Sequence, residues 1–208
     1  MELFKRERGL PIKVLNVGSS TAHFRRVEQP HIDALLFSRI NKPDQVFHLD
    51  LKQGDGVDIV GSITDYNLLD QLCGMKFDIV ICSNVLEHVT NRTEFVNALA
   101  QLVSPGSRLI LTVPNEYPYH NDPIDTMYRP TPSELIREFP MMTPLVAEML
   151  EIEGSYYRLL RGDFKMFISL ILRVLLPFYR YENWKKICAS IYSMHRQFGV
   201  TCVALFRH

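Results

Sequence analysis

The stretch FDIVICSNVLEHV occupies residues 77–89 and decides the fold class of this 208-residue chain. Its first half is a continuous apolar run rich in β-branched residues, which is typical of a strand buried on both faces of a parallel sheet. Its second half turns polar at Ser83 and Asn84. Because open α/β sheets bind their ligands beyond the carboxyl ends of the strands, this pattern predicts a ligand site at residue 83 and beyond.

Similar apolar segments alternate with a helical pattern on either side of this stretch. A helix is expected over 92–103, where apolar residues recur at helical spacing, and another is expected to begin near Ser133 with Thr131 or Ser133 as its N-cap. The order strand, helix, strand with short links predicts right-handed parallel crossovers within a single domain over 1–208. The expected strands cover 13–17, 46–51, 77–83, 108–113 and 200–206.

The composition argues against several classes of protein. The 23 basic and 23 acidic residues give a formal net charge of zero, so no nucleic-acid partner is expected. The four cysteines form no CxxC pair, which favours buried free thiols in a reducing compartment over a zinc site. No signal-peptide pattern and no apolar run of roughly 20 residues is present, so we expect a cytoplasmic protein.

The stretch FKMFISLILRVLLPFYRY at 164–181 is strongly apolar but carries basic residues. It lies within a segment over 155–195 that we interpret as a helical insertion. Such an element could cover the site, mediate a homo-oligomer or rest on a membrane surface. The alternative is a helix that simply packs on the sheet.

Several segments resemble, in order, the motifs of class I S-adenosylmethionine (SAM)-dependent methyltransferases. They are VLNVGSSTA at 14–22, VFHLD at 46–50, DIVGSITD at 58–65, FDIVICSNVLEHV at 77–89 and SPGSRLILTVPN at 104–115. The resemblance implies an α/β fold, a Rossmann-like and mostly parallel seven-stranded sheet with helices on both faces, here with a helical insertion before the last strand. It also implies SAM as the cofactor.

The resemblance assigns cofactor contacts to the turn after the first strand, at Asn16, Gly18, Ser19 and Ser20. Gly18 is a glycine of the usual motif, whereas Ser20 and Ala22 stand where glycines are common.

Further cofactor contacts are implied at the ends of the later strands. Asp50 resembles the acid that binds the ribose, with an insertion around 30–43 accounting for its distance from Gly18; alternatively it caps the following turn. Ser62 and Ile63 would lie beside the adenine, and Ser83 and Asn84 would face the methionine part.

The polar, aromatic loop at 114–132 is longer than a minimal connection and predicts a binding loop. Within it, His120 is the first candidate for a general base and His88 the second, with Asp122 or Asp125 orienting the imidazole. Alternatively, Asp125 and Arg129 form a structural ion pair, and His88 packs or caps. A divalent ion on His120, Asp122 and Asp125 lacks a fourth ligand, so no metal is predicted. The candidate substrate-binding residues are Tyr117, Tyr119, Asp125 and Arg129.

The combined pattern predicts SAM-dependent methyl transfer to a small molecule, with a sugar or lipid-linked glycan hydroxyl as the suggested acceptor. The alternative is a non-catalytic methyltransferase-like binding or assembly protein, which the loss of motif glycines would suit. A nicotinamide-dependent dehydrogenase is disfavoured because the chain lacks the G-x-G-x-x-G turn that binds a pyrophosphate.

Overall fold

The computed structural model describes residues 11–40, 45–120, 124–155, 157, 161, 164–176, 181–192 and 197–208. Its strands are β1 (Lys13–Val17), β2 (Gln45–Asp50), β3 (Ile59–Val60), β4 (Ile79–Ser83), β5 (Arg108–Pro114), β6 (Thr143–Ser155) and β7 (Gln197–Phe206). Short helical turns are η2 (Phe24–Glu28), η3 (Ile32–Leu36), η4 (Phe37–Arg39) and η5 (Leu86–His88). The longer helices are α1 (Tyr66–Met75), α2 (Arg92–Leu102), α3 (Pro132–Arg137), α5 (Phe164–Leu175) and α6 (Tyr181–Tyr192).

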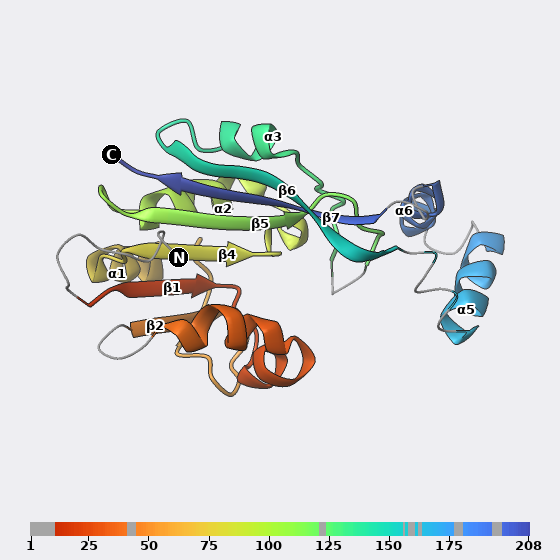
Figure 1. The fold of residues 1–208 in the computed structure, drawn as a ribbon, viewed down its shortest axis with the longest axis horizontal. Helices are drawn as coiled ribbons and strands as arrows, with labels where there is room; N and C mark the ends of the chain where they lie inside the picture. Colours follow the sequence, from red (N-terminus) through yellow and green to blue (C-terminus); the bar gives the residue numbers. More distant parts are fainter. Residues whose placement is uncertain are drawn as a thin grey trace.

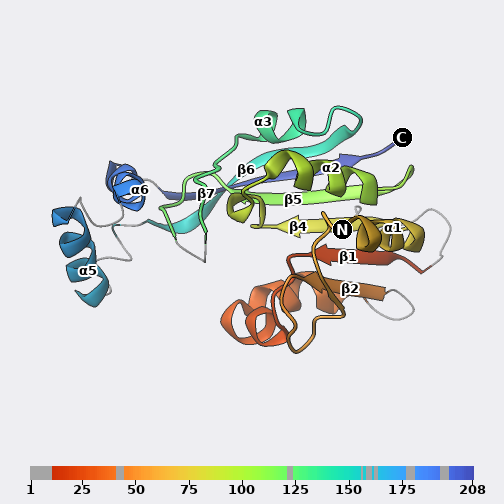
Figure 2. The same cartoon turned by 180° about the vertical axis from the view of Figure 1, so that it is seen from behind.

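The strands form one seven-stranded sheet in the order β3-β2-β1-β4-β5-β7-β6 (Figure 1). β1 to β5 pair in parallel, whereas β7 runs antiparallel to both β5 and β6. Helices α1 and α2 cover one face of the sheet, as the view from behind shows (Figure 2), and η2 to η4 cover the other. The predicted mostly parallel Rossmann-like sheet, with helices on both faces and an insertion before the last strand, is confirmed.

The central strand β4 is buried on both faces, as its unbroken apolar sequence predicts. Ile79 and Ile81 pack toward η3 and η4, in a cluster with Val14 and Phe37. Val80 and Cys82 point the other way, into the main core beneath α1 and α2. Alternate side chains of one strand thus belong to two separate cores, which is why β4 is apolar up to its last residue, Ser83.

Helices α1, α2 and α3 begin at side chains that accept hydrogen bonds from their first turns. The Asp65 carboxylate accepts from the backbone N–H of Leu68 at 2.9 Å before α1. Before α3, Thr131 and Glu134 form a reciprocal capping box, with Pro132 in the first turn. Thr131 is therefore the N-cap, one of the two residues that the sequence suggested.

A long strand, β6, occupies residues 143–155, where the sequence analysis assigned no element. It pairs along β7 with irregularities between Pro144 and Val146 and between Ile152 and Ser155. Leu145 and Met149 are exposed, as befits an edge strand. Residues such as Ala, Glu, Met and Leu favour a helix locally, so the strand arises from pairing with a partner about fifty residues later in the chain.

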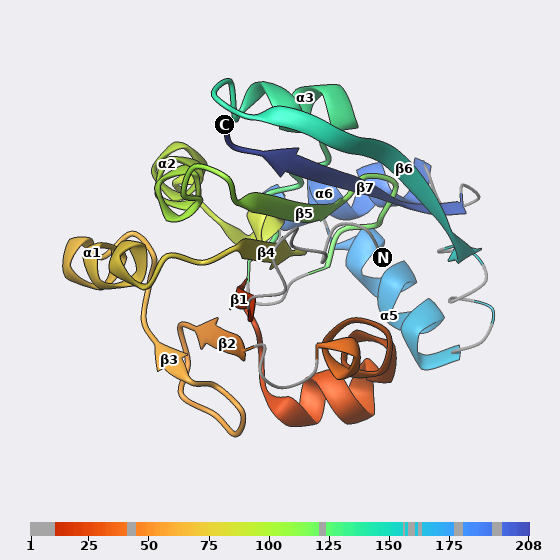
Figure 3. The ribbon, with the colours of Figure 1, turned by 60° about the vertical axis from the view of Figure 1, so that its left-hand side comes forward.

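Helices α5 and α6 lie beyond the carboxyl ends of the parallel strands (Figures 1 and 3). Leu170 and Ile187 are buried between them, and Tyr119 from the loop after β5 packs against this pair. The Trp184 indole N–H also donates to the Val174 carbonyl at 2.9 Å. Within the described parts of the chain, no helix has the length and apolar character needed to cross a bilayer.

Candidate functional site

The strand order reverses between β1 and β4, so the segments that leave these two strands diverge at the carboxyl edge of the sheet. In open α/β sheets, this position is where ligands bind. Gly18, directly after β1, and Asn84, directly after β4, are both exposed there. The sequence placed its cofactor site at this edge, and the structure brings its candidate residues to the ends of neighbouring strands.

The turn after β1 keeps a tight backbone conformation although it lacks two of the usual glycines. The N–H groups of Gly18 and Ser19 both donate to the Leu49 carbonyl at 2.9 Å. Gly18 has φ +71°, and a Cβ at this position would overlap Cγ2 of Val85. Ser20 has φ +53°, a left-handed conformation that glycine adopts more readily. The turn has therefore kept the geometry of a glycine motif without its full sequence.

Asp50, at the end of β2, contacts this turn directly. One carboxylate oxygen accepts from the Ser20 N–H at 2.8 Å, and the other accepts from the Lys52 N–H at 3.1 Å. The sequence left two roles open for Asp50, the ribose acid and a cap of the following turn. The structure shows that it caps backbone groups on both sides, and its half-buried carboxylate lies at the edge where a ribose is expected.

Arg25 is part of this turn and was missed by the sequence analysis. Its buried guanidinium donates to the carbonyls of Ser19 at 3.0 Å, Ser20 at 2.6 Å and Gly56 at 2.8 Å. Burial lowers the pKa of Arg25 from its usual value. The side chain ties the turn to the segment after β2, and its position in an ordinary-looking helical stretch gives no sequence signal for this role.

Asn16 lies on β1 directly opposite His48 on β2. The Asn16 side-chain amide and the His48 Nδ1 atom are 3.2 Å apart, and the His48 ring meets Phe37 edge to face. Burial, aided by the charge of Arg25, lowers the pKa of His48 to about 4, so the imidazole is neutral at physiological pH. The Asn16 amide is thus engaged within the sheet, and a cofactor contact from Asn16 stays a prediction.

The remaining candidate cofactor-binding residues contact neighbouring side chains of the protein. The Ser62 hydroxyl lies 2.7 Å from that of Thr64, and the Ile63 side chain is fully buried in the main core. Ser83 ends β4 opposite Thr112, whose hydroxyl donates to the Asn84 side chain at 3.3 Å. These contacts place the residues, and their roles toward SAM stay predictions.

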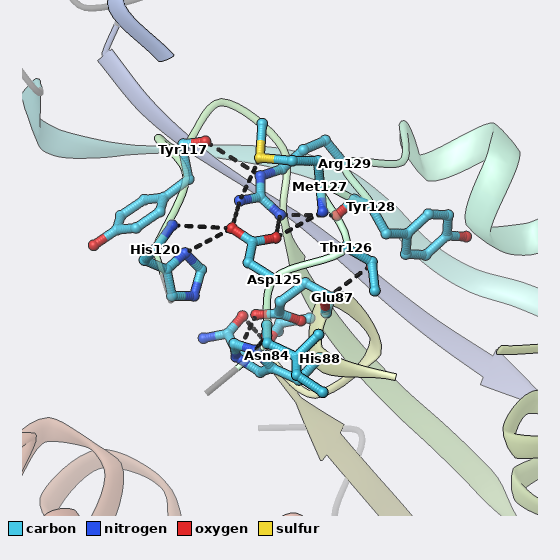
Figure 4. Close-up of polar contacts among 12 residues, drawn as sticks. Asn84, Glu87, His88, Tyr117, His120, Asp125, Thr126, Met127, Tyr128 and Arg129 are labelled. Atoms are coloured by element: carbon cyan, nitrogen blue, oxygen red, sulfur yellow. Dashed lines mark hydrogen bonds and ion pairs between the residues drawn. The ribbon is translucent and has the colours of Figure 1, made fainter. Parts of the chain in front are cut away.

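An ion pair between Asp125 and Arg129 organises the loop after β5 (Figure 4). The two Arg129 Nη atoms contact the two Asp125 oxygens at 3.2 and 2.7 Å, while the Met127 N–H donates to the carboxylate at 2.7 Å. Arg129 also donates to the Tyr117 carbonyl at 3.2 Å. These donors hold the pKa of Asp125 well below its usual range despite its burial. Of the two roles considered for this pair, the structural ion pair is present, and substrate binding stays a prediction.

This pairing also bears on the metal site that the sequence considered on His120, Asp122 and Asp125. The Asp125 carboxylate is already occupied by its donors, and Asp122 lies outside the described residues. The role proposed for Asp122 in orienting the His120 imidazole therefore stays a prediction.

The turn after β4 carries Glu87 and His88, and the loop after β5 brings His120 next to them (Figure 4). His88 Nε2 lies 3.8 Å from a Glu87 carboxylate oxygen, and the two imidazole rings meet edge to face with centroids 5.2 Å apart. His120 Nδ1 lies 3.3 Å from the Asp125 carboxylate, which raises the pKa of His120. His120 and His88, the two candidate bases, are therefore neighbours, and Asp125 contacts the His120 ring; its role in orienting a base stays a prediction.

Glu87 was not among the sequence-predicted site residues. Its side chain is fully buried, and burial raises its pKa. Its backbone carbonyl accepts from both the N–H and the hydroxyl of Thr126, which joins the turn after β4 to the loop after β5. The sequence signal was present in the polar ending of FDIVICSNVLEHV, but a buried carboxylate cannot be distinguished from an exposed one without the fold.

The two candidate substrate-binding tyrosines, Tyr117 and Tyr119, pack in different places around the cluster. The Tyr117 ring meets His120 edge to face at 5.3 Å and also packs on Phe198. Tyr119 packs instead on the buried pair between α5 and α6. From α6, the Lys186 ammonium reaches the Asp125 carbonyl at 2.7 Å. The insertion therefore contacts the site loop, a connection that the sequence did not reveal.

A cavity of about 540 Å³ lies elsewhere, at the amino edge of the sheet. It is lined by residues at the start of β2 and β3 and along α1, and contains none of the candidate site residues. The chemistry of the side chains, not the depth of a cavity, therefore locates the site.

Comparisons with known proteins agree with this architecture. A family model described as a methyltransferase domain matches residues 2–144, more than half of the chain. The ubiquinone biosynthesis O-methyltransferase of Dechloromonas aromatica (strain RCB) is 38% identical over 68 residues. That alignment covers 33% of this chain, and the chain spans only 28% of the relative's length.

Solved structures with the same fold include one of coclaurine N-methyltransferase bound to N-methylheliamine and SAH. It aligns with a TM-score of 0.57 at 14% identity, over 95% of this chain and 66% of that chain. The [4+2]-cyclase SpnF aligns with a TM-score of 0.52 at 14% identity, over 95% and 75% of the two chains. These likenesses show the fold alone, but the match over residues 2–144 means that the chain belongs to the methyltransferase domain family, as its resemblance to class I SAM-dependent methyltransferases predicted.

Proposed function

We propose that this chain transfers the methyl group of SAM to a hydroxyl group of a small molecule. One observation carries the proposal: the expected cofactor turn adjoins a cluster of acid–base side chains. Val85, which closes over Gly18, is followed two residues later by Glu87 and then by His88, and His120 joins them from the next loop. Cofactor and acceptor would therefore meet at one edge of the sheet.

The turn after β1 fits the cofactor. Gly18 is exposed, and its lack of a side chain opens the backbone to a ligand while leaving room for Val85. Asp50 accepts from the Ser20 N–H with one oxygen and from the Lys52 N–H with the other, and its half-buried carboxylate would accept further hydrogen bonds from a ribose. When bound, SAM supplies a sulfonium methyl group, which passes to the acceptor oxygen as the S–C bond breaks and an O–C bond forms, leaving S-adenosylhomocysteine. Asn16, Ser19, Ser62, Ile63, Ser83 and Asn84 complete the proposed cofactor-binding set.

A hydroxyl acceptor must also lose its proton, and in its simplest form the proposal gives this proton to His120. Asp125 engages Nδ1 of His120 at 3.3 Å, so Nε2 is left to accept. Arg129 fixes the carboxylate in turn. This chain of contacts orients the imidazole before the acceptor arrives, which is what a general base requires.

The class of acceptor is supported by three features. The similar protein from Dechloromonas aromatica is named as an O-methyltransferase, which favours oxygen. Tyr117 offers an aromatic ring beside His120, suited to a sugar or an aromatic acceptor. The zero net charge offers no attraction to a nucleic acid. A sugar or lipid-linked glycan hydroxyl remains the specific acceptor that we suggest.

The proposed contact with a membrane surface or a second copy would use residues 164–181. On α5, Phe167, Ile171 and Leu172 are exposed, and Lys165 and Arg173 are basic. Sedimentation with anionic vesicles, alongside the oligomeric state from analytical ultracentrifugation, tests this contact. A monomeric protein that stays in the supernatant when the vesicles are pelleted would contradict it.

Calorimetric titration of the purified chain with SAM tests the proposed function. We expect saturable binding that Asp50→Ala weakens by about 1–3 kcal/mol, the usual effect of losing a hydrogen bond to a charged group. Asp70→Ala, at an exposed position on α1, is the matched control and should bind as the wild type does. No binding at millimolar SAM would instead favour a non-catalytic binding or assembly protein.

A further inference from the structure

Glu87 is a buried carboxylate that the described part of the protein does not satisfy. Its side chain is fully excluded from solvent, and among the described residues neither carboxylate oxygen has a hydrogen-bond partner. Burying a carboxylate without partners is costly, so such groups bind a cation, take up a proton or pair with a charged neighbour. The nearest basic atom, Nε2 of His88, is 3.8 Å away, beyond hydrogen-bond distance.

Two imidazoles are oriented toward this carboxylate. Nδ1 of His88 contacts the Ile124 carbonyl, and Nδ1 of His120 contacts the Asp125 carboxylate at 3.3 Å. With each Nδ1 donating its hydrogen to an oxygen acceptor, the lone pair of each ring is on Nε2. In metal-binding histidines, the ring nitrogen that does not bind the metal commonly donates to a carboxylate or a carbonyl, and this hydrogen bond orients the ring.

We propose that Glu87, His88 and His120 bind one divalent transition-metal ion of the Zn²⁺, Fe²⁺ or Mn²⁺ type. One potential ligand atom from each residue lies within 4.8 Å of the others. Ligands of a shared ion at about 2.1 Å are separated by roughly 3–3.5 Å, so small side-chain rotations would close the site. Two imidazoles with one carboxylate are a donor set that suits these ions and leaves coordination positions open.

Two alternatives, a proton or a neighbouring cation, would act on Glu87 alone. A proton on Glu87 would remove its charge but would give neither imidazole Nε2 atom a ligand. Arg129 is hydrogen-bonded to the Asp125 carboxylate and Lys186 to the Asp125 carbonyl, and within the described residues neither donates a hydrogen bond to Glu87. The charge of Arg129 therefore acts on Glu87 only through space. A metal ion would satisfy Glu87, His88 and His120 together.

The consequence for the reaction rests on the proposed function. An open position on the ion would take the acceptor hydroxyl oxygen, and the ion would lower its pKa so that the proton leaves to solvent. The resulting alkoxide would then attack the methyl carbon as the S–C bond breaks. His120 would serve as a ligand, replacing the simpler role as a base, and Asp125 would be a positioning residue that orients it.

Metal uptake can be measured without SAM or an acceptor. The full chain, stripped with a chelator and dialysed, is titrated with Zn²⁺ by calorimetry and with Co²⁺ by visible absorption. We expect one ion per chain, with affinity reduced at least tenfold in Glu87→Gln and in His120→Ala. His23→Ala, at an exposed histidine just before η2, should bind as the wild type does.

Thermal unfolding of the same samples gives a second readout. Without metal, Glu87→Gln should be as stable as the wild type or more so, because the variant removes a buried charge. With Zn²⁺, only the wild type and His23→Ala should gain stability. His88→Gln provides a further ligand variant should either of the others fail to fold.

The inference is overturned if the stripped wild type takes up neither ion, or if Glu87→Gln binds as tightly as the wild type. A Zn²⁺ site unaffected by all three ligand variants also overturns it. SAM titrations on these samples keep the two proposals apart. SAM binding without metal uptake would leave the proposed function standing alone, whereas metal uptake without SAM binding would leave only the metal site.

Discussion

The turn after β1 and the cluster around Glu87 differ in whether their polar groups have hydrogen-bond partners. In the turn, the backbone groups of Gly18, Ser19 and Ser20 are bonded to Leu49, Asp50 and Arg25. In the cluster, both carboxylate oxygens of Glu87 lack a partner among the described residues. The turn is satisfied within the chain, whereas the cluster leaves a buried carboxylate without a hydrogen-bond partner in the described part of the chain.

This difference separates two ways of building a site. The turn provides shape, because its hydrogen bonds fix an exposed backbone against which a cofactor can lie. The cluster provides reactivity, because an unsatisfied group retains the capacity to bind an ion or a proton. Changes in the turn should therefore affect stability and cofactor affinity, whereas changes in the cluster should affect ligand uptake.

The largest expected effect comes from filling the turn. Gly18→Ala places a Cβ against Val85 in a left-handed backbone conformation, so we expect the free energy of unfolding to fall by about 3 kcal/mol. Denaturant unfolding measures it. Gly74→Ala, in open space on α1, is the control and should change stability by no more than about 1 kcal/mol. If Gly18→Ala is as stable as the wild type, the turn does not depend on the close approach of Val85 to the Gly18 backbone.

A smaller effect concerns His48, a half-buried titratable group whose Nδ1 atom, unlike the Glu87 carboxylate, has a hydrogen-bond partner. Its pKa of about 4 lies below the usual 6.5, so between these values the unfolded chain binds more protons than the folded one. Acidification through this window should therefore lower stability by about 2 kcal/mol through His48 alone.

Unfolding of the wild type and His48→Gln at several pH values isolates this contribution. The variant should lose less stability than the wild type between pH 6.5 and 4. Equal slopes would mean that His48 is not kept neutral by burial.

The smallest expected effect tests the missing glycine of the turn. Ser20→Gly removes the strain of φ +53°, so stability should rise by up to about 1 kcal/mol, with SAM affinity kept or increased. Lys76→Gly, also at φ +53° but at the end of α1, is matched in conformation and remote from the turn. It should give a similar gain in stability without changing SAM affinity. A loss of SAM affinity in Ser20→Gly would show that the serine side chain itself serves the cofactor.

Much of the fold could be predicted because local patterns and tertiary structure agree. The apolar run before Ser83 became the central strand, and the helix predicted over 92–103 became α2 (Arg92–Leu102). The strand β6 could not be predicted in this way. Its sequence favours a helix locally, and it forms a strand because β7, far along the chain, provides the pairing edge.

By itself, the sequence determined the parallel core and the family, and it proposed the carboxyl edge as the candidate site with His88, His120 and Asp50 among its residues. Periodicity and the order of motifs carry this information, because both depend on neighbours along the chain. Only the tertiary structure decided that Arg25 braces the turn, that Asp125 binds Arg129, and that Glu87 is buried beside two histidines. Burial and hydrogen-bond satisfaction are properties of surroundings that distant segments supply, so no local pattern encodes them.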